Sequence, residues 1–355
     1  MPELREVFEM TTKQMGEPDL DSWREQERRQ RKASRNRKLG AIVVVAALLI
    51  AGVVVGVSTL GNDDVQPGGS SDDSTLTPDG AEQTLSIIDV GSGTATPFTA
   101  PAGASDFDFT LDGSMVAYVD VDANGNDQVF VMDADGSNAR QLTRGEGDIR
   151  VEEALPGTGT SGGRLDWSPD GSMIAYQRDT SDGPEIFTVR ISDGVSTRVT
   201  NEPPAVGPGG WAPDAGSLVF STLNPSIPHY SALSVDLGTG QTTLIVPDGS
   251  TPKLSPDGDW IAFNSWLKPH IRLILANSDG SGRRVIARFE GDDGYQEWSP
   301  DSTQIAFDAD IPLNASPVER SGFGTHVYDL ATGETRFVST GTIETWIDND
   351  HILVS

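Results

Sequence analysis

Three of the four histidines stand at comparable places in the sequence, and histidine is the most common metal ligand among side chains. His229, His270 and His326 each come just before the third predicted strand of a repeat, in three successive repeats. Equivalent positions in a ring of repeats share one rim, so these imidazoles are candidates for a ligand or metal site there. The alternative is that they are exposed loop histidines without a partner.

A second candidate site has the spacing of a calcium-binding loop. Asp120, Asp122 and Asn124 stand at alternate positions, as the first oxygen ligands of such a loop do. The loop glycine is present at Gly125, but the twelfth position is Val131 and the bidentate glutamate is missing. A hairpin turn is the alternative, because Asn-Gly is a strong signal for a tight connection between strands. We therefore expect no cofactor, with Ca2+ at this loop as the alternative.

Charged side chains also gather in two long predicted insertions, 145–164 and 308–324. The insertions lie on the rim predicted for the histidines, and long loops on a rigid scaffold are the usual place for recognition. Arg150, Arg164 and Arg320 are the cationic candidates for ligand contacts in these segments. Neutral lengthening of surface loops is the alternative, because it costs little free energy.

The sequence contains no convincing nucleophile. Gly-Thr-Ser-Gly-Gly at 159–163 has the spacing of a hydrolase elbow, but it lies in a Gly/Thr loop rather than between a strand and a helix. Cysteine is absent, which excludes disulfides, zinc–thiolate sites and a thiol nucleophile. We therefore expect no catalytic residue and a function other than catalysis.

The elements that position these residues come from an internal repeat. Asp-Trp-Ser-Pro-Asp-Gly at 166–171, followed by Ile-Ala-Tyr at 174–176, recurs with variations along the chain. The lead residues of the six copies are 109, 167, 211, 254, 298 and 346, at steps of 58, 44, 43, 44 and 48 residues. Such a period, with four short strands in each unit, is typical of propeller blades. In each turn, proline presets φ, aspartate caps the turn and glycine takes a conformation that other residues avoid.

The two ends of the repeat region complete one another. The last copy stops at Ser355 after its second strand, whereas the region begins with an outer hairpin that lacks inner strands, at 84–99. We therefore expect 84–99 to complete the sixth blade and close the ring, which removes exposed sheet edges. The fold class is all-β: a six-bladed β-propeller over 84–355, preceded by a transmembrane helix.

The repeats resemble a known family. Trp-Ser-Pro-Asp-Gly at 167–171 and Val-Phe-Val-Met-Asp-Ala-Asp-Gly-Ser-Asn-Ala-Arg-Gln-Leu-Thr at 129–143 resemble the WD40-like repeats of the TolB C-terminal six-bladed propeller. The resemblance covers about 84–355 and implies the fold more specifically than the function, because this repeat also builds many binding proteins and the propellers of certain peptidases. The α/β domain of TolB has no counterpart here, so the direct role of TolB does not carry over.

The N-terminal part divides into three segments. Residues 1–38 are a mixed-charge tail, 39–60 form an uncharged apolar stretch, and 61–83 are a Gly/Ser/Asp/Pro spacer that we expect to be a flexible linker. The apolar stretch is long enough to cross a membrane, and the basic residues before it place the tail in the cytoplasm and the propeller outside. A cleaved secretory signal is the alternative, although 38 residues precede this stretch.

The charge distribution limits the partners. The chain carries a formal charge of −28, and residues 61–355 hold 15 basic and 45 acidic side chains. Nucleic-acid binding is therefore excluded, because it requires a basic surface. The acidic surface either attracts cationic ligands or serves solubility and salt adaptation; the spread of acid over every blade favours the second. In the tail, Leu4, Val7 and Phe8 follow helical spacing and are candidates for docking a partner.

These features together predict a single-pass cell-membrane protein of the bacterial type. Its monomeric, extracytoplasmic propeller would bind a protein, peptide or envelope ligand, and its tail would signal inward, for example to a sigma factor. One alternative is an enzyme, a lyase or hydrolase, at the propeller mouth; another is a passive scaffold of the envelope. Inward-facing charged residues with shifted pKa values around the central axis would favour the enzyme.

Overall fold

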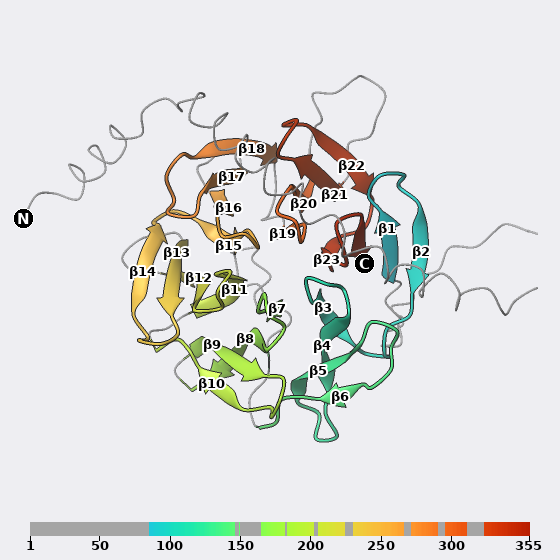
Figure 1. Cartoon of the computed structure of the whole chain (residues 1–355), viewed down its shortest axis with the longest axis vertical. Coiled ribbons are helices and arrows are strands. Elements are labelled where there is room, and N and C mark those ends of the chain that lie inside the picture. Colours follow the sequence, from blue (N-terminus) through green and yellow to red (C-terminus); the bar gives the residue numbers. More distant parts are fainter. Residues whose placement is uncertain are drawn as a thin grey trace, which may run out of the picture.

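The computed structural model describes residues 85–145, 149, 165–181, 183–201, 205–223, 230–265, 271–289, 295–310 and 323–355. These residues form six four-stranded antiparallel sheets arranged as the blades of a ring (Figure 1). The predicted six-bladed propeller is therefore confirmed. The tail at 1–38, the apolar stretch at 39–60 and the linker at 61–83 lie outside the described residues.

The four strands of each blade are ordered from the centre of the ring to its periphery. The first blade contains β3 (Ser105–Phe109), β4 (Met115–Val121), β5 (Asp127–Asp133) and β6 (Arg140–Gln141). The second contains β7 (Asp166–Trp167), β8 (Met173–Thr180), β9 (Gly183–Arg190) and β10 (Ser196–Arg198). The third contains β11 (Ala205–Trp211), β12 (Ser217–Leu223), β13 (Tyr230–Asp236) and β14 (Thr242–Val246).

The other three blades follow the same order. The fourth contains β15 (Ser250–Leu254), β16 (Trp260–Ser265), β17 (Ile271–Asn277) and β18 (Arg284–Phe289). The fifth contains β19 (Gln296–Trp298), β20 (Gln304–Asp310), β21 (Phe323–Asp329) and β22 (Thr335–Ser339). The sixth contains β23 (Ile343–Trp346), β24 (His351–Val354), β1 (Leu85–Asp89) and β2 (Ala95–Phe98).

The sixth blade closes the ring with strands from both ends of the repeat region. Its order is β23-β24-β1-β2, so the last strand of the chain pairs with the first described strand. In this pairing Ile87 stands opposite Leu353 and Ile88 opposite Ile352. The prediction that 84–99 completes this blade is confirmed for the described strands.

The repeated turn has the construction expected from its residues. The Asp170 side chain accepts hydrogen bonds from the amide of Ser172, at 3.0 Å, and from the hydroxyl of Ser168, at 2.7 Å. Gly171 has a φ of +68°, a left-handed conformation that most side chains disfavour. The turn thereby reverses the chain between the innermost strand and the second strand of the blade.

Second strands supply much of the core between blades. Ile174, Ala175 and Tyr176 are all fully buried, as expected for a strand covered on both faces. Neighbouring blades share these contacts: Val219 of β12 lies in one buried cluster with Ile261 and Phe263 of β16. Burying a large apolar side chain contributes about 1.5–3 kcal/mol, so these contacts stabilise the order of the blades.

Outer strands carry a recurrent irregularity in their pairing. The register shifts by one residue between Ala232 and Leu233 on β13, between Leu273 and Ile274 on β17, and between Thr325 and His326 on β21. Such β-bulges give equivalent positions in different blades that can be compared directly.

Among the described residues, 85–355 with their gaps, there is no helix long and apolar enough to cross a membrane.

Candidate functional site

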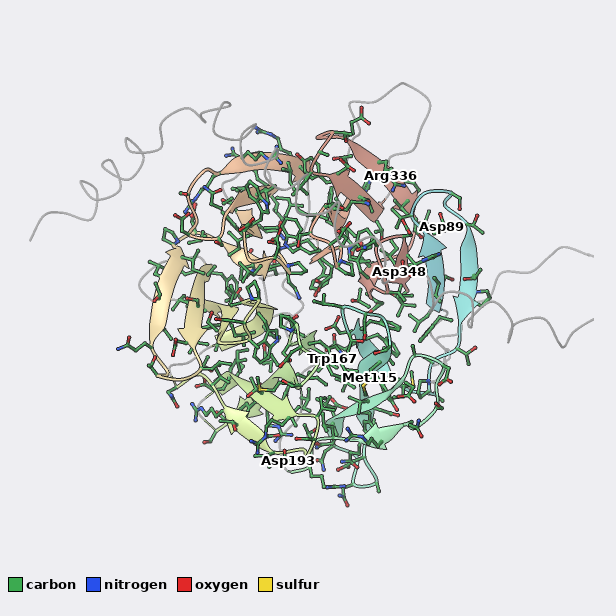
Figure 2. The ribbon with its side chains drawn as sticks, in the orientation of Figure 1. Asp89, Met115, Trp167, Asp193, Arg336 and Asp348 are labelled. Atoms are coloured by element: carbon green, nitrogen blue, oxygen red, sulfur yellow. The ribbon has the colours of Figure 1, made fainter. Side chains whose placement is uncertain are left out.

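The innermost strand of every blade places one residue directly before its lead residue. Because side chains alternate along a strand, this residue faces away from the side on which the lead residue packs. Figure 2 shows Trp167 on the inner side of its blade and Asp193 at the outer rim. The residues that precede the lead residues are Asp108, Asp166, Gly210, Lys253, Glu297 and Thr345. We call the four charged members, Asp108, Asp166, Lys253 and Glu297, the axial cluster.

An ion pair joins two neighbouring blades within this cluster. Nζ of Lys253 lies 2.7 Å from Oε1 of Glu297, and the two side chains are only 5% and 17% exposed. Tyr295 supports both partners: its hydroxyl donates a hydrogen bond to Glu297, and Nζ of Lys253 lies 5.2 Å from the centre of its ring. The single lysine is therefore held by a carboxylate and an aromatic face.

The two aspartates tie further blades together. Asp108 accepts hydrogen bonds from the Thr345 hydroxyl and the Trp167 amide, both at 2.9 Å, so it connects the first blade with the sixth and the second. Asp166 accepts a hydrogen bond from the Gly210 amide at 2.6 Å, which connects the second blade with the third.

Lead tryptophans reinforce the same junctions. The Trp167 indole donates to the carbonyl of Asp108 at 3.0 Å, and the Trp298 indole donates to the carbonyl of Lys253 at 2.9 Å. Trp211 and Trp346 make the equivalent bonds to Asp166 and Glu297. Each bond joins a lead tryptophan to the axial residue of the preceding blade, so these bonds bridge four of the six junctions between inner strands.

Burial and crowding of like charges shift the protonation of the cluster. Although part of Asp108 remains accessible to solvent, burial together with the charges of Asp166 and Glu297 raises its pKa to about 8. Burial also raises the pKa of Asp166. Burial acts to lower the pKa of Lys253, but Glu297 and Asp166 outweigh it and hold the value above its usual range. Near neutral pH the cluster thus contains one ammonium and at least one protonated carboxyl group.

The axial cluster was not among the residues selected from sequence, although the signal is present in the repeat. Aligning the copies on their lead residues leaves a charged side chain at the preceding position in four of the six. The lead residue and the turn after it recur more strictly than the residue before them, so the repeat motif itself does not include the charged position. The cluster also consists of charged groups around the axis with shifted pKa values, which is the feature expected of an enzyme.

Most of the site residues proposed from sequence cannot be placed. His229, His270, Arg150, Arg164 and Arg320 lie outside the described residues, as do the tail residues Leu4, Val7 and Phe8.

The position expected for His326 was wrong. His326 lies inside β21 rather than before it, and it is only 1% exposed. Its ring stacks on Phe307 and meets Phe337 edge-on, and its Nδ1 lies 3.0 Å from the carbonyl oxygen of Gly324. Burial lowers the pKa of this imidazole. The imidazole packs as an aromatic ring in the core, so His326 is not a rim ligand in this structure.

Of the candidate calcium residues, Asp120 lies at the end of β4, whereas Asp122 and Asn124 lie in the turn between β4 and β5. Oδ1 of Asp122 accepts the amides of Asn124 at 2.8 Å and Asn126 at 3.1 Å, while Asp120 accepts the amide of Val121 at 2.7 Å. These bonds build the tight turn that was the alternative interpretation. A cavity of about 650 Å³ borders this hairpin; it is lined by Asp122, Ala123, Asn124, Asn126, Gln141, Arg144 and Gly145. No group of three or more acidic or histidine side chains among the described residues is arranged to hold a metal ion.

Comparisons with known proteins give relatives in both sequence and structure. No family model matches the chain. The uncharacterised protein Atu1656 of Agrobacterium fabrum is 27% identical over 154 residues, which are 41% of this chain. The match spans about half the length of that relative.

The structural neighbours with the stronger overlap are TolB proteins. A structure described as a putative TolB from Agrobacterium tumefaciens superposes with a TM-score of 0.60 at 17% identity, covering 77% of this chain and 97% of that one. TolB from Acinetobacter baumannii gives a TM-score of 0.52 at 14% identity, covering 76% of this chain and 62% of that one. At such identities the likeness concerns the fold alone, and it supports the TolB-like six-bladed propeller predicted from the repeats.

Proposed function

We propose that this chain is a cell-envelope binding protein. Residues 39–60 anchor it in the membrane as a single span, 1–38 lie in the cytoplasm, and the propeller stands outside as a monomer that binds a protein, peptide or envelope ligand. The tail passes the bound state inward, for example to a sigma factor, through the stripe of Leu4, Val7 and Phe8. The length and flanking charge of the apolar stretch support the anchor.

The observation that carries the binding function is the mutual bonding of the axial cluster. Lys253 pairs with Glu297 across a blade junction, and Asp108 holds both of its neighbouring blades. These charged side chains form an ion pair and hydrogen bonds between neighbouring blades. The propeller is therefore a rigid scaffold for recognition at its surface. Leu111 lies in the turn after the inner strand β3, two residues beyond its end, and is 41% exposed, so we choose this end of the ring near the axis as the contact surface.

In-cell photo-crosslinking tests the binding surface. A photoreactive amino acid is placed in the full chain at Leu111 or, as a control, at Val195, which is 47% exposed in the outer hairpin of the second blade. We expect a discrete crosslinked species from position 111 and none from 195. Equal or absent crosslinking at both positions would contradict recognition near the axis.

Two further measurements test the anchor and the tail. An epitope tag after Ser355 should be cleaved by protease added to intact spheroplasts, whereas a tag before Met1 should be protected. An immobilised peptide of residues 1–38 should retain a specific cytoplasmic protein, and substitution of Leu4, Val7 and Phe8 by serine should abolish this. Loss of protection at the N-terminus would overturn the topology, and a failed capture would overturn the signalling role alone.

A second candidate function is catalysis at the axis by a lyase or hydrolase. The raised pKa of Asp108, about 8, favours it, because a carboxyl group that keeps its proton near neutral pH can serve as a general acid. The test is turnover of polysaccharide or peptide substrates by the full chain and by Asp108→Asn. Product formation that is lost in this variant, with unchanged stability, would favour the enzyme over the binding protein.

A further inference from the structure

The fourth blade reverses the charge of the surrounding chain. Its residues 250–289 hold six basic and three acidic side chains, whereas 61–355 as a whole hold 15 basic and 45 acidic ones. Acidic residues are thus present in this blade, as in the others, but here basic residues outnumber them. Arg272 of β17 and Arg284 and Arg288 of β18 lie in the two outer strands of this blade, and β18 is its outermost strand (Figure 1).

Two of these arginines face one another. Arg272 and Arg288 stand directly opposite in the antiparallel register of β17 and β18. Like charges at such positions destabilise a sheet unless a counter-charge lies between them. The salt bridges found within the described part of the chain include neither arginine, and Nε of Arg272 is buried without a hydrogen-bond partner. Within the described residues, therefore, no carboxylate is ion-paired with either arginine.

Equivalent positions in the first two blades show what the fourth blade lacks. Arg272 directly precedes Leu273, where the register shifts. Gln128 of β5 and Glu185 of β9 hold the corresponding position, because the next residue in each strand, Val129 or Ile186, accepts the amides of two successive residues through its carbonyl oxygen. Gln128 accepts a hydrogen bond from the Thr143 hydroxyl at 2.8 Å. Glu185 is ion-paired with Arg198 at 2.5 Å. In those blades the side chain at this position is satisfied by the adjacent outer strand.

The fourth blade has apolar residues at the positions of those partners. Ala287 takes the place of Thr143, and Val285 takes the place of Arg198. Val285 is 39% exposed and Arg288 is also exposed. The outer edge thus combines an exposed apolar side chain with two cations that have no ion-pair partner among the described residues. As the last strand of its sheet, β18 also has a main-chain edge available for pairing.

We propose that the outer edge of the fourth blade, defined by Arg272, Val285 and Arg288, docks an acidic extended segment of a partner protein. Carboxylates of the segment lie between the two guanidinium groups, and an apolar side chain covers Val285. Its backbone extends the sheet along β18, a recurrent mode of peptide recognition. This docking surface is separate from the axial cluster, so it does not rest on the function proposed above.

Electrostatic screening favours a short peptide over a large polyanion. A charge on the propeller acts over about 8 Å at physiological salt, so a short segment feels mainly the local cations. An anionic membrane or a second copy of this chain would instead also meet the acidic surface of the other blades, which repels it. The partner that fits is therefore a local acidic strand of polypeptide.

Peptide binding to the full chain in nanodiscs tests the proposal. The probe is a fluorescent peptide of sequence Ser-Glu-Glu-Leu-Glu-Val-Glu-Ser, with the same composition in lysine instead of glutamate as a control, measured by anisotropy. The double variant Arg272→Gln, Arg288→Gln should weaken binding of the acidic peptide by about tenfold or more, since two charge-assisted contacts are lost. The matched double variant Arg140→Gln, Arg190→Gln removes the same charge from the first two blades and should bind as the wild type does.

Two more readouts keep the test decisive. Arg288→Gln alone should raise the melting temperature without peptide, because it removes the like-charge pair while Arg288 itself is exposed. The affinity of the full chain for phosphatidylglycerol vesicles should be the same in the Arg272→Gln, Arg288→Gln variant as in the wild type. Equal peptide affinity of the two double variants, an unchanged or lower melting temperature of Arg288→Gln, or vesicle binding that depends on these arginines would overturn the proposal.

Discussion

Nζ of Lys253 lies 2.7 Å from Oε1 of Glu297, and this pair joins the inner strands of the fourth and fifth blades. Lys253 is also the positive charge that opposes the raised pKa of Asp108 and of Asp166. Lys253 is thus the one cation of the axial cluster, beside three acidic side chains, in a chain with a formal charge of −28.

Replacing Lys253 by methionine should therefore destabilise the propeller strongly. Removing one partner of a buried ion pair leaves an uncompensated charge, at a cost of about 3–5 kcal/mol. Chemical denaturation of the variant measures this change. The double variant Lys253→Met, Glu297→Gln should lose less stability than the sum of the single changes.

The control for this experiment is the exposed ion pair of Arg190 and Asp193, whose side chains are 55% and 45% exposed. Arg190→Met should leave the melting temperature unchanged, because exposed pairs contribute little. Equal stability of Lys253→Met and the wild type would show that the axial pair has no structural role.

Asp108 should make the stability of the propeller fall as pH rises. Its pKa is about 8 in the folded chain against 3.8 ordinarily, so between these values the folded state holds a proton that the unfolded state releases. The free energy of unfolding then decreases with increasing pH, by at most about 1.4 kcal/mol per pH unit for one proton, and levels off above pH 8. Asp108→Asn should flatten the profile between pH 5 and 8, as measured by denaturation across this range.

Asp112→Asn is the matched control for that profile. Asp112 lies in the turn after β3, where hydrogen bonds from Ser114 and Thr110 outweigh burial and lower its pKa. Its pKa therefore lies below the ordinary 3.8, outside the range from pH 5 to 8, and its loss should leave the slope in that range unchanged. A profile that is the same in Asp108→Asn and the wild type would contradict the protonated carboxyl at the axis.

His326 should act in the opposite direction at acidic pH. Burial lowers its pKa below the usual 6.5, so as pH falls through this value the unfolded state takes up the proton first and unfolding becomes easier. His326→Leu should reduce the loss of melting temperature between pH 7.5 and 5.5. An unchanged loss, or a melting temperature that rises with added zinc only when His326 is present, would contradict its assignment to the core.

The repeat predicted the blades because it is local and occurs six times. Trp167 and the turn after it mark where one strand ends and the next begins. The partial copies at the two ends of the repeat region predicted closure of the ring. The axial cluster and His326 depend instead on side-chain direction. Sequence showed that Lys253 and Glu297 hold equivalent positions, but their distance and the resulting pKa shifts follow from how tightly the inner strands approach.

The glycine turns should differ in their tolerance of a side chain. Gly136 and Gly258 have φ values of +82° and +76°, so alanine is strained at both, by about 1–2 kcal/mol. A Cβ at Gly136 would meet nothing within 4 Å, whereas at Gly258 it would lie 2.7 Å from Cδ of Pro213 in the preceding blade. Gly258→Ala should therefore cost about 1–3 kcal/mol more than Gly136→Ala, because its packing must also shift. Equal costs in chemical denaturation would show that these turns do not pack between blades.

Closure of the ring gives the last prediction. Leu353 of β24 is fully buried and stands opposite Ile87 of β1, so it lies where the two ends of the repeat region meet. Leu353→Ala should lower the free energy of unfolding by about 2–5 kcal/mol through lost burial and the cavity that remains. Leu244→Ala removes the same atoms from an outer strand where the side chain is 57% exposed, and it should have little effect. Because β1 and β2 contribute half of the sixth blade, deleting 85–99 should abolish the single cooperative transition in thermal denaturation. If Leu353→Ala proves as mild as Leu244→Ala, or the deleted chain still unfolds in one transition at the same temperature, then pairing of the chain ends does not hold the propeller closed.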